Sequence, residues 1–231
     1  MRIGGLQKLT LLDYPGKVAC TVFLSGCNLR CPYCHNPGLV LPEQSEGSEI
    51  PEAEVLSFLE RRKGTLDGVC ITGGEPTLQP ELPEFLEKLR RLGYAVKLDT
   101  NGTNPAMLKA LLQERVLDYV AMDIKNSPSR YAETCGGIDC LSRVRESAAL
   151  LMDGTVDYEF RTTVVRELHD EDSFRAIGPW LKGARRYFLQ AFVDRDTVLS
   201  PGLHPCSREE MEGFAALVRP FIPQAELRGV D

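Results

Sequence analysis

The sequence has no long apolar segment and no excess of basic residues. No window approaches the run of about 18 uncharged apolar residues that a transmembrane helix needs, and Asp13 and Pro15 interrupt the apolar stretch nearest the N-terminus. We therefore expect no signal peptide and no membrane partner, and we predict a cytoplasmic location. The 27 Lys and Arg residues against 33 Asp and Glu residues give a net charge of −6. Such a chain has no global basic field to hold a phosphate backbone, so we expect no nucleic-acid partner.

Low-complexity stretches are also missing, and the hydrophobic content of 43% is that of an ordinary globular protein. We predict a single domain over residues 1–231, with a core over residues 16–220 and a short N-terminal extension. Within it, Glu43–Glu49 is expected to be a polar loop rather than a linker. Eight cysteines are too few for a secreted disulfide scaffold of this length. In a cytoplasmic chain we expect them to be ligands, nucleophiles or core residues.

Six short segments rich in Val, Ile, Leu or Phe have the composition of strands that are buried on both faces. They are Val18–Ser25, Gly68–Gly73, Ala95–Thr100, Tyr119–Lys125, Tyr158–Val165 and Arg186–Val193. Segments with helical periodicity follow them: Pro51–Arg62, Pro80–Leu92, Pro105–Glu114, Leu141–Met152, Asp172–Leu181 and Ser207–Val218. The alternation predicts an α/β fold with a parallel sheet, either a partial (β/α)6 TIM-type barrel or a doubly wound sheet. Asn104 and Ser207 are expected N-caps.

The strongest chemical signal is the run GCNLRCPYCHN, which follows the first predicted strand. Its cysteines Cys27, Cys31 and Cys34 have the spacing C-x3-C-x2-C, so three thiolates can surround one soft metal centre. A closed zinc site needs four ligands, and a [4Fe–4S] cluster normally has a Cys on each iron. With three cysteines, one iron keeps an open position for a small molecule. The alternative is three buried loop cysteines, or a zinc site completed by His35 or a distant Cys.

This run resembles the cluster motif of the radical S-adenosylmethionine (SAM) superfamily. The resemblance implies a [4Fe–4S] cluster whose open iron chelates SAM, and reductive cleavage of SAM to methionine and a 5′-deoxyadenosyl radical. Tyr33 matches the aromatic position that lies near the adenine. Gly73, Gly74 and Glu75, in the GGEP segment that ends the second predicted strand, match the motif that contacts the methionine amino group. No side chain is then expected to act as acid, base or nucleophile, because the cofactors carry the reaction.

Polar residues end the third and fourth predicted strands. Asp99, Thr100 and Asn101 end the third, and Asp123 and Lys125 end the fourth, at the sheet edge that carries the chemistry in parallel α/β folds. The alternative is that both aspartates only cap loops. The segments LDTNG and MDIK resemble those of the glycyl-radical-enzyme activases. There the matching aspartates and Thr bind a monovalent cation beside the SAM carboxylate, and the matching Lys touches SAM.

Two further positions correspond to residues that contact SAM in the activases. Arg161, inside the fifth predicted strand, matches the activase arginine that meets the SAM carboxylate, and a structural ion pair is the alternative. Gln190, in the sixth, stands where activases of the pyruvate formate-lyase type carry a His that contacts SAM. This departure argues against the pyruvate formate-lyase activase itself.

The run LQKLTLLDYPGKVACTVFLSGCNLRCPYCHNP is most similar to the longer, single-domain anaerobic ribonucleoside-triphosphate reductase activating proteins, and the resemblance extends over residues 5–220. It implies an enzyme that generates a glycyl radical on the reductase and receives electrons from a flavodoxin- or ferredoxin-type donor. Two alternatives stay open. One is another radical SAM enzyme acting on a different glycyl radical enzyme, a peptide or a small molecule, and the other is a non-enzymatic zinc or iron–sulfur protein.

The remaining cysteines and histidines give weaker signals. Cys20 and Cys70 lie inside predicted strands and are expected in the core. Cys135, Cys140 and Cys206 leave open a second metal or a disulfide, because TCGGIDC has a C-x4-C spacing. His169, in the acidic run ELHDED, is expected to be solvated.

Overall fold

A computed structural model describes residues 1–41, 49–195 and 197–230. Apart from Glu49, the expected polar loop Glu43–Glu49 lies outside these residues. The chain divides into two compact units. Unit 1 comprises Met1–Asn28, Gly38–Thr100 and Asn104–Val120, and unit 2 comprises Leu29–Pro37, Asn101–Thr103 and Ala121–Asp231. A single domain over residues 1–231 stays a prediction.

The strands form an eight-stranded sheet in chain order, from β1 at one edge to β8 at the other. The strands are β1 (Ile3–Thr10), β2 (Ala19–Leu24), β3 (Gly68–Gly73), β4 (Ala95–Thr100), β5 (Tyr119–Asp123), β6 (Asp157–Val164), β7 (Tyr187–Ala191) and β8 (Ala225–Arg228). β1 is antiparallel to β2, whereas β2–β3, β3–β4, β6–β7 and β7–β8 are parallel. The predicted α/β fold, a partial barrel whose sheet does not close, is therefore confirmed, and the antiparallel strand β1 is an addition to the predicted parallel sheet. The predicted set of six strands lacks β1 and β8.

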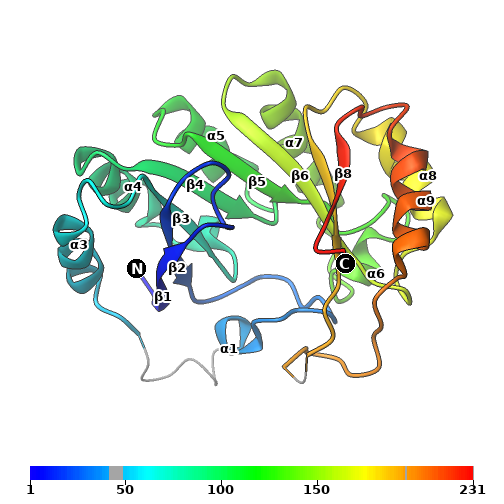
Figure 1. The fold of residues 1–231 in the computed structure, drawn as a ribbon, viewed down its shortest axis with the longest axis horizontal. Helices are drawn as coiled ribbons and strands as arrows, with labels where there is room; N and C mark the ends of the chain where they lie inside the picture. The colour runs from blue at the N-terminus through cyan, green and yellow to red at the C-terminus, as the bar shows by residue number, and fades with distance from the viewer. Residues whose placement is uncertain (42–48, 196, 231) are drawn as a thin grey trace. The chain divides into compact units, whose positions relative to one another are not determined.

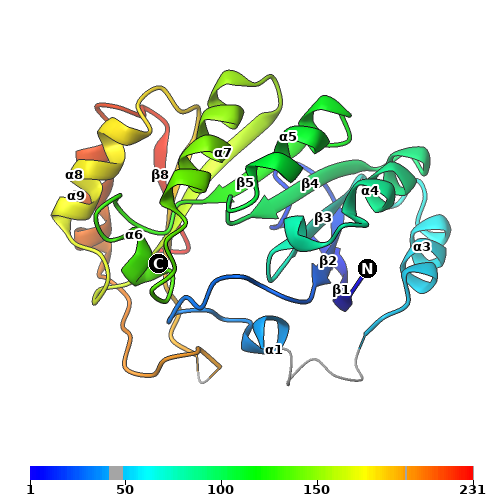
Figure 2. The same ribbon diagram turned by 180° about the vertical axis from the view of Figure 1, so that it is seen from behind.

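Unit 1 carries α3 (Glu52–Arg61), α4 (Leu82–Arg91) and α5 (Pro105–Gln113). Figure 2 shows α4 and α5 in front of β3 and β4. The buried side chains of α4, which are Leu82, Phe85, Leu86 and Leu89, recur at the spacing of one helical face. Asn104 caps α5, as predicted, because its Oδ1 accepts a hydrogen bond from Met107 N at 3.2 Å.

Unit 2 carries α6 (Tyr131–Thr134), α7 (Leu141–Asp153), α8 (Glu171–Trp180) and α9 (Arg208–Val218). α8 and α9 lie side by side (Figure 1), and the rings of Phe174 and Phe214 stack between them with centroids 4.7 Å apart. Ser207 caps α9 in a capping box with Glu210, which confirms the predicted cap. The remaining short elements are α1 (Pro37–Val40) and the 3-10 helix η1 (Pro76–Leu78). Across the described ranges, every helix is too short or too polar to cross a membrane.

Candidate functional site

In unit 1, the GGEP segment is hydrogen-bonded to the chain that leads to Cys27. Gly74 N donates to Leu24 O and Glu75 N donates to Gly26 O, both at 2.8 Å. Only glycine fits here, because a Cβ on Gly73 would collide with the Leu24 backbone and one on Gly74 with Gly26 O. Gly73 also has a φ of 125°. The structure therefore brings the predicted residues Gly73, Gly74 and Glu75 next to the segment that carries Cys27.

The Glu75 carboxylate is fully buried beneath this turn. Its Oε1 accepts hydrogen bonds from Thr77 N at 3.1 Å, from Thr77 Oγ1 at 2.5 Å and from Thr100 Oγ1 at 2.7 Å. The carboxylate thereby joins the ends of β3 and β4. Thr100, predicted as a SAM or cation residue, contacts Glu75 through its hydroxyl.

The second charged group of unit 1 is the ion pair of Lys97 and Asp99 on β4. The two residues are i and i+2 on one strand, so their side chains lie on the same face. Cys70 Sγ on neighbouring β3 is 3.7 Å from both Lys97 Nζ and Asp99 Oδ1. Lys97, whose side chain is 2% exposed, was not among the predicted residues. It supplies a positive charge that partly offsets the Asp99 charge.

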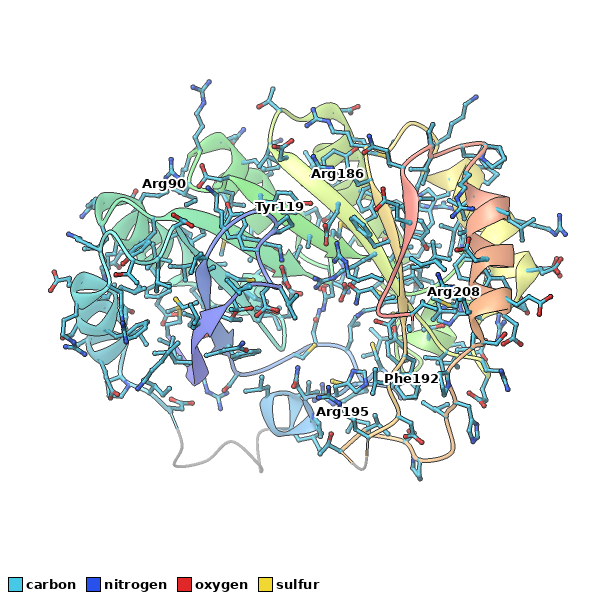
Figure 3. The ribbon with its side chains drawn as sticks, viewed as in Figure 1. Arg90, Tyr119, Arg186, Phe192, Arg195 and Arg208 are labelled. Atoms are coloured by element: carbon cyan, nitrogen blue, oxygen red, sulfur yellow. The ribbon has the colours of Figure 1, made fainter. Side chains whose placement is uncertain are left out.

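In unit 2, Cys31 and Cys34 lie in the loop that precedes α1. Three contacts fix this loop. Arg30 N donates to Cys135 O at 3.2 Å, and Ser200 N donates to Pro32 O at 2.9 Å. His35 stacks on Phe192 (labelled in Figure 3) with centroids 5.3 Å apart. The loop is thus held by segments from three other parts of unit 2.

The electrostatic centre of unit 2 is the Asp123 carboxylate at the end of β5. Its Oδ1 is 2.6 Å from Arg161 Nε, and its Oδ2 is 2.8 Å from Lys125 Nζ. Burial alone would raise the pKa of Asp123, but Arg161 and Lys125 outweigh it and hold that pKa below its usual range. One carboxylate and two cations carry a net charge of +1, which suits an anionic ligand. The structure brings three of the predicted residues together here.

Tyr33 lies beside this charged group, with its ring centroid 5.8 Å from Lys125 Nζ. The ring is buried, and its hydroxyl has no hydrogen-bond partner among the residues that the structure describes. Burial raises the pKa of Tyr33 well above its usual value. A buried hydroxyl without a partner is costly unless a ligand completes it.

The backbone of Lys125 is fixed by two side chains from the same unit. Its N–H donates to Tyr131 Oη at 3.2 Å, and its carbonyl oxygen is 2.9 Å from His169 Nε2. The prediction that His169 is solvated is wrong, since it is 3% exposed and its Nδ1 also accepts from Val165 N at 3.1 Å. The acidic neighbours of His169 in sequence obscured this role.

Gln190 lies on β7, in register with Thr163 of β6. The guanidinium of Arg228 on β8 donates to Gln190 Oε1 at 3.4 Å, forms a two-point ion pair with buried Glu159 at 2.8 and 3.1 Å, and stacks on Phe188. Because an Arg can only donate, Gln190 turns its oxygen to Arg228, and its amide NH₂ remains a donor for other groups. Neither Arg228 nor Glu159 was predicted.

The last predicted residue, Asn101, shapes the loop after β4. Its Oδ1 accepts from Thr103 N at 2.9 Å and from Thr103 Oγ1 at 2.6 Å, which closes a tight turn within unit 2. Asn101 therefore has a structural role of its own, and contact with SAM stays a prediction.

None of the eight cysteines forms a disulfide. Cys20 and Cys70 are buried in β2 and β3, as predicted. In the described residues, no group of three or more His, Cys, Asp or Glu side chains is arranged to hold a metal ion, and this holds for Cys27, Cys31 and Cys34 as well as for Cys135, Cys140 and Cys206. The sulfurs of Cys135 and Cys140 are 3.9 Å apart, within hydrogen-bonding distance for thiols.

Comparison with known proteins places the chain in a family. Residues 21–175 match the radical SAM superfamily. The chain belongs to this superfamily. Radical SAM enzymes use a [4Fe–4S] cluster and SAM, so this chain is an enzyme with these two cofactors.

The radical SAM relatives include activating enzymes. An inferred glycyl-radical enzyme activating enzyme of Methanocaldococcus jannaschii is 34% identical over 200 residues, which cover 84% of this chain and 81% of the relative. The pyruvate formate-lyase-activating enzyme of Clostridium pasteurianum is 36% identical over 54% of this chain and 52% of its own length. A 7-carboxy-7-deazaguanine synthase of Methanopyrus kandleri is 35% identical over 48% of this chain and 51% of its own length.

Solved structures agree on the fold of this radical SAM enzyme. Streptococcus suis SuiB bound to its precursor peptide SuiA superimposes with a TM-score of 0.70 at 14% identity, over 90% of this chain and 48% of SuiB. The AdoMet-bound enzyme anSMEcpe gives 0.62 at 20% identity, over 86% of this chain and 57% of that chain. At these identities the likeness concerns the fold alone.

The residues present fit both cofactors. Cys27, Cys31 and Cys34, none of which is in a disulfide, offer the soft sulfur donors that an iron–sulfur cluster takes. The positively charged group of Asp123, Lys125 and Arg161 suits the carboxylate of SAM, and the Tyr33 hydroxyl beside it lacks a partner in the described part of the chain.

Proposed function

We propose that this radical SAM enzyme is an activase that generates a glycyl radical on an anaerobic ribonucleoside-triphosphate reductase. The observation that carries the proposal is the Asp123 carboxylate held between Lys125 and Arg161. This arrangement presents two cations in the same unit as Cys31 and Cys34, and it joins the MDIK segment to Arg161, both of which match activase positions. The relative from M. jannaschii, matched over 81% of its length, supports the same class.

In this proposal, each predicted residue holds one part of the cofactors. Cys27, Cys31 and Cys34 ligate the cluster. Lys125 and Arg161 bind the SAM carboxylate, and Tyr33 lies against the adenine. The residues assigned to the remaining contacts with SAM are Gly73, Gly74, Glu75, Asn101 and Gln190, and Asp99, Thr100 and Asp123 are assigned to a monovalent cation beside the SAM carboxylate.

When bound, the reduced cluster and SAM supply methionine and a 5′-deoxyadenosyl radical. The chain contributes orientation and exclusion of water, since Tyr33, Cys31 and Glu75 are buried. The proposed reaction moves a hydrogen atom from the Cα of a glycine on the partner to the 5′ carbon, which yields 5′-deoxyadenosine and a glycyl radical. An electron from a flavodoxin- or ferredoxin-type donor reduces the cluster.

The proposal is tested by electron paramagnetic resonance on a mixture of the reconstituted enzyme, a reductant, SAM and the reductase. We expect the doublet signal of a glycyl radical. The same mixture with the radical-site Gly of the reductase changed to Ala should lack it. If the native mixture gives no doublet although SAM is cleaved, the reductase is not the substrate.

Cluster ligation has its own test. Changing Cys27, Cys31 or Cys34 to Ala should abolish iron loading and SAM cleavage, whereas Cys20→Ala, in a buried strand, should retain both. Full SAM cleavage by the Cys31→Ala protein would exclude this ligand set.

A monovalent cation at Asp99, Thr100 and Asp123 belongs to the same proposal. Protein cations already neighbour both aspartates: Lys97 pairs with Asp99, and Lys125 and Arg161 together more than offset the charge of Asp123. Activity that depends on potassium or sodium would support the cation. Equal activity in tetraalkylammonium buffer would show that the protein cations suffice.

A second candidate function is a radical SAM reaction on a small molecule. This second function is supported by the 35% identity to a 7-carboxy-7-deazaguanine synthase, which extends across 48% of this chain and 51% of that relative. In this second function the same residues bind the cluster and SAM, and only the substrate differs. A small molecule that stimulates SAM cleavage and is itself modified would establish it.

A further inference from the structure

Gln190 of the candidate site is held by an arginine to which the proposed function gives no role. Arg228, the last residue of β8, donates from Nη1 to Gln190 Oε1 at 3.4 Å. The two residues are in register on neighbouring parallel strands, so their side chains leave the sheet on the same face. Among the described residues, this is the only hydrogen bond that the Gln190 side chain makes. Arg228 therefore determines how the Gln190 amide is turned.

The face that carries Gln190 also carries the charged group around Asp123. Arg161, which pairs with Asp123, is in register with Phe188 of β7. Phe188 and Gln190 are i and i+2 on that strand, so both lie on the same face as Arg161. Gln190 thus lies on the side of the sheet to which the proposed function assigns the SAM carboxylate.

Contacts with Glu159 and Phe188 hold the Arg228 guanidinium in place. Its Nη1 and Nη2 are 2.8 and 3.1 Å from the two carboxylate oxygens of Glu159. The Glu159 side chain is 1% exposed, so water competes little for this pair. Arg228 Cζ also lies 3.8 Å from the centre of the Phe188 ring. A planar guanidinium is suited to a two-point pair combined with ring stacking, and a lysine ammonium is not.

The chemistry of the guanidinium fixes which end of the Gln190 amide is turned to Arg228. A guanidinium has donors only, so it binds the carbonyl oxygen Oε1. The NH₂ group of the same amide is turned away from Arg228, and it can only donate. In the absence of Arg228, the Gln190 side chain has several rotamers available, and either end of its amide can meet a ligand. The contact therefore makes Gln190 a donor of fixed direction.

We infer that Arg228, anchored by Glu159 and Phe188, is a positioning residue that orients the Gln190 amide so that its NH₂ group donates a hydrogen bond to an acceptor atom of SAM. The inference rests on the contact between Gln190 and SAM in the proposed function. SAM has acceptors in its carboxylate, its ribose hydroxyls and its adenine. Because the amide is oriented before SAM binds, less side-chain freedom is lost on binding.

Equilibrium binding of SAM to the reconstituted enzyme, without reductant, tests the inference. Gln190→Ala removes the donor and should raise the Kd about fivefold. Gln190→Glu keeps an acceptor for Arg228 but has no NH₂ group, so it should raise the Kd at least as much. The double variant Glu159→Gln/Arg228→Met removes the ion pair without leaving a buried charge. It should raise the Kd about threefold, because only a fraction of the freed amides then point their NH₂ group at SAM.

A double-mutant cycle separates positioning from a general structural effect. In the Gln190→Ala background, the changes at Glu159 and Arg228 should not alter the Kd further, because no amide is left to orient. Arg185→Gln is the matched control. Arg185 forms an exposed ion pair with Asp157 at the amino end of β6, and its replacement should leave the Kd unchanged.

A wild-type Kd in the Glu159→Gln/Arg228→Met protein would overturn the inference. Equal fold-changes in the wild-type and Gln190→Ala backgrounds would also overturn it, because Arg228 would then act independently of the amide. If the double variant does not fold, Arg228→Lys, which keeps a charge for Glu159 and loses the planar fork, decides in the same cycle. A wild-type Kd in Gln190→Ala would instead overturn the proposed contact of Gln190 with SAM, and the inference with it.

Discussion

Arg161 and Asp123 form an ion pair between neighbouring strands, with Arg161 Nε 2.6 Å from Asp123 Oδ1. Lys125 Nζ lies 2.8 Å from the other carboxylate oxygen, Asp123 Oδ2. Asp123 therefore orients both cations and cancels only one of their two charges. A carboxylate ligand that arrives here meets a net positive charge from groups already held in place, so little reorganisation is needed.

The first prediction concerns this positive charge. Changing Arg161 to Gln leaves Asp123 and Lys125 as a neutral pair, so the affinity for SAM should fall about tenfold or more through the loss of a charge-assisted contact. Equilibrium binding of SAM to the reconstituted protein measures this effect. Arg166→Gln is the control, since Arg166 forms an exposed pair with Glu210 and should leave the affinity unchanged. Unchanged SAM affinity in Arg161→Gln would show that the carboxylate binds elsewhere.

The second prediction concerns the Lys97–Asp99 pair on β4. Lys97→Met removes the cation and leaves Asp99 as a poorly solvated charge, which should lower the free energy of unfolding by about 3 kcal/mol. The double variant with Asp99→Asn removes both charges and should recover most of that loss. Denaturant unfolding of the cluster-free proteins measures both. Equal denaturant midpoints for wild type and Lys97→Met would show that the Lys97–Asp99 ion pair does not stabilise the protein.

The third prediction concerns pH and buried His169. Burial lowers the pKa of His169 in the folded state below its unfolded value of about 6.5. The unfolded chain then binds more protons than the folded one below that pH, so stability is complete above about pH 6.5 and is lost as the pH falls toward the folded pKa.

The measurement is the free energy of unfolding between pH 5 and 8 for wild type and His169→Gln. The wild type should lose up to about 1.4 kcal/mol more per pH unit than the variant in the window below pH 6.5. Parallel curves would mean that His169 stays solvated enough to titrate normally, contrary to its contacts with Lys125 O and Val165 N.

The sequence predicted the six strands β2 to β7, and the bounds of each agree with the structure to within about two residues. Their buried residues are mostly apolar, although β4 and β6 also carry charged side chains. β1 contains two glycines and three exposed residues, and β8 has only four residues, of which Ala225 alone is buried. Both lie at sheet edges, where pairing with a neighbour stabilises the strand more than its own composition does.

Much of the candidate site was predictable for a different reason. The cysteine run and GGEP are local motifs, and Arg161 was predicted from its match to the activase arginine; its ion pair with Asp123 is the partner that a charge inside an apolar strand needs. The same pattern, a charged residue inside an apolar strand, also marks Lys97 in AVKLDT and Glu159 in DYEFRTTV, and both side chains are buried in ion pairs. His169 could not be assigned from its neighbours, since its partner is the carbonyl of Lys125, 44 residues away.

In the proposed function, this enzyme transfers a hydrogen atom from a glycine of a partner reductase to SAM-derived 5′-deoxyadenosyl. The most direct measurement uses a reductase labelled with deuterium at the glycine Cα, followed by mass spectrometry of the 5′-deoxyadenosine formed. The proposed function predicts one deuterium in 5′-deoxyadenosine with the native reductase and none when the radical-site glycine is replaced by Ala. Unlabelled 5′-deoxyadenosine from the native, deuterated reductase would contradict it.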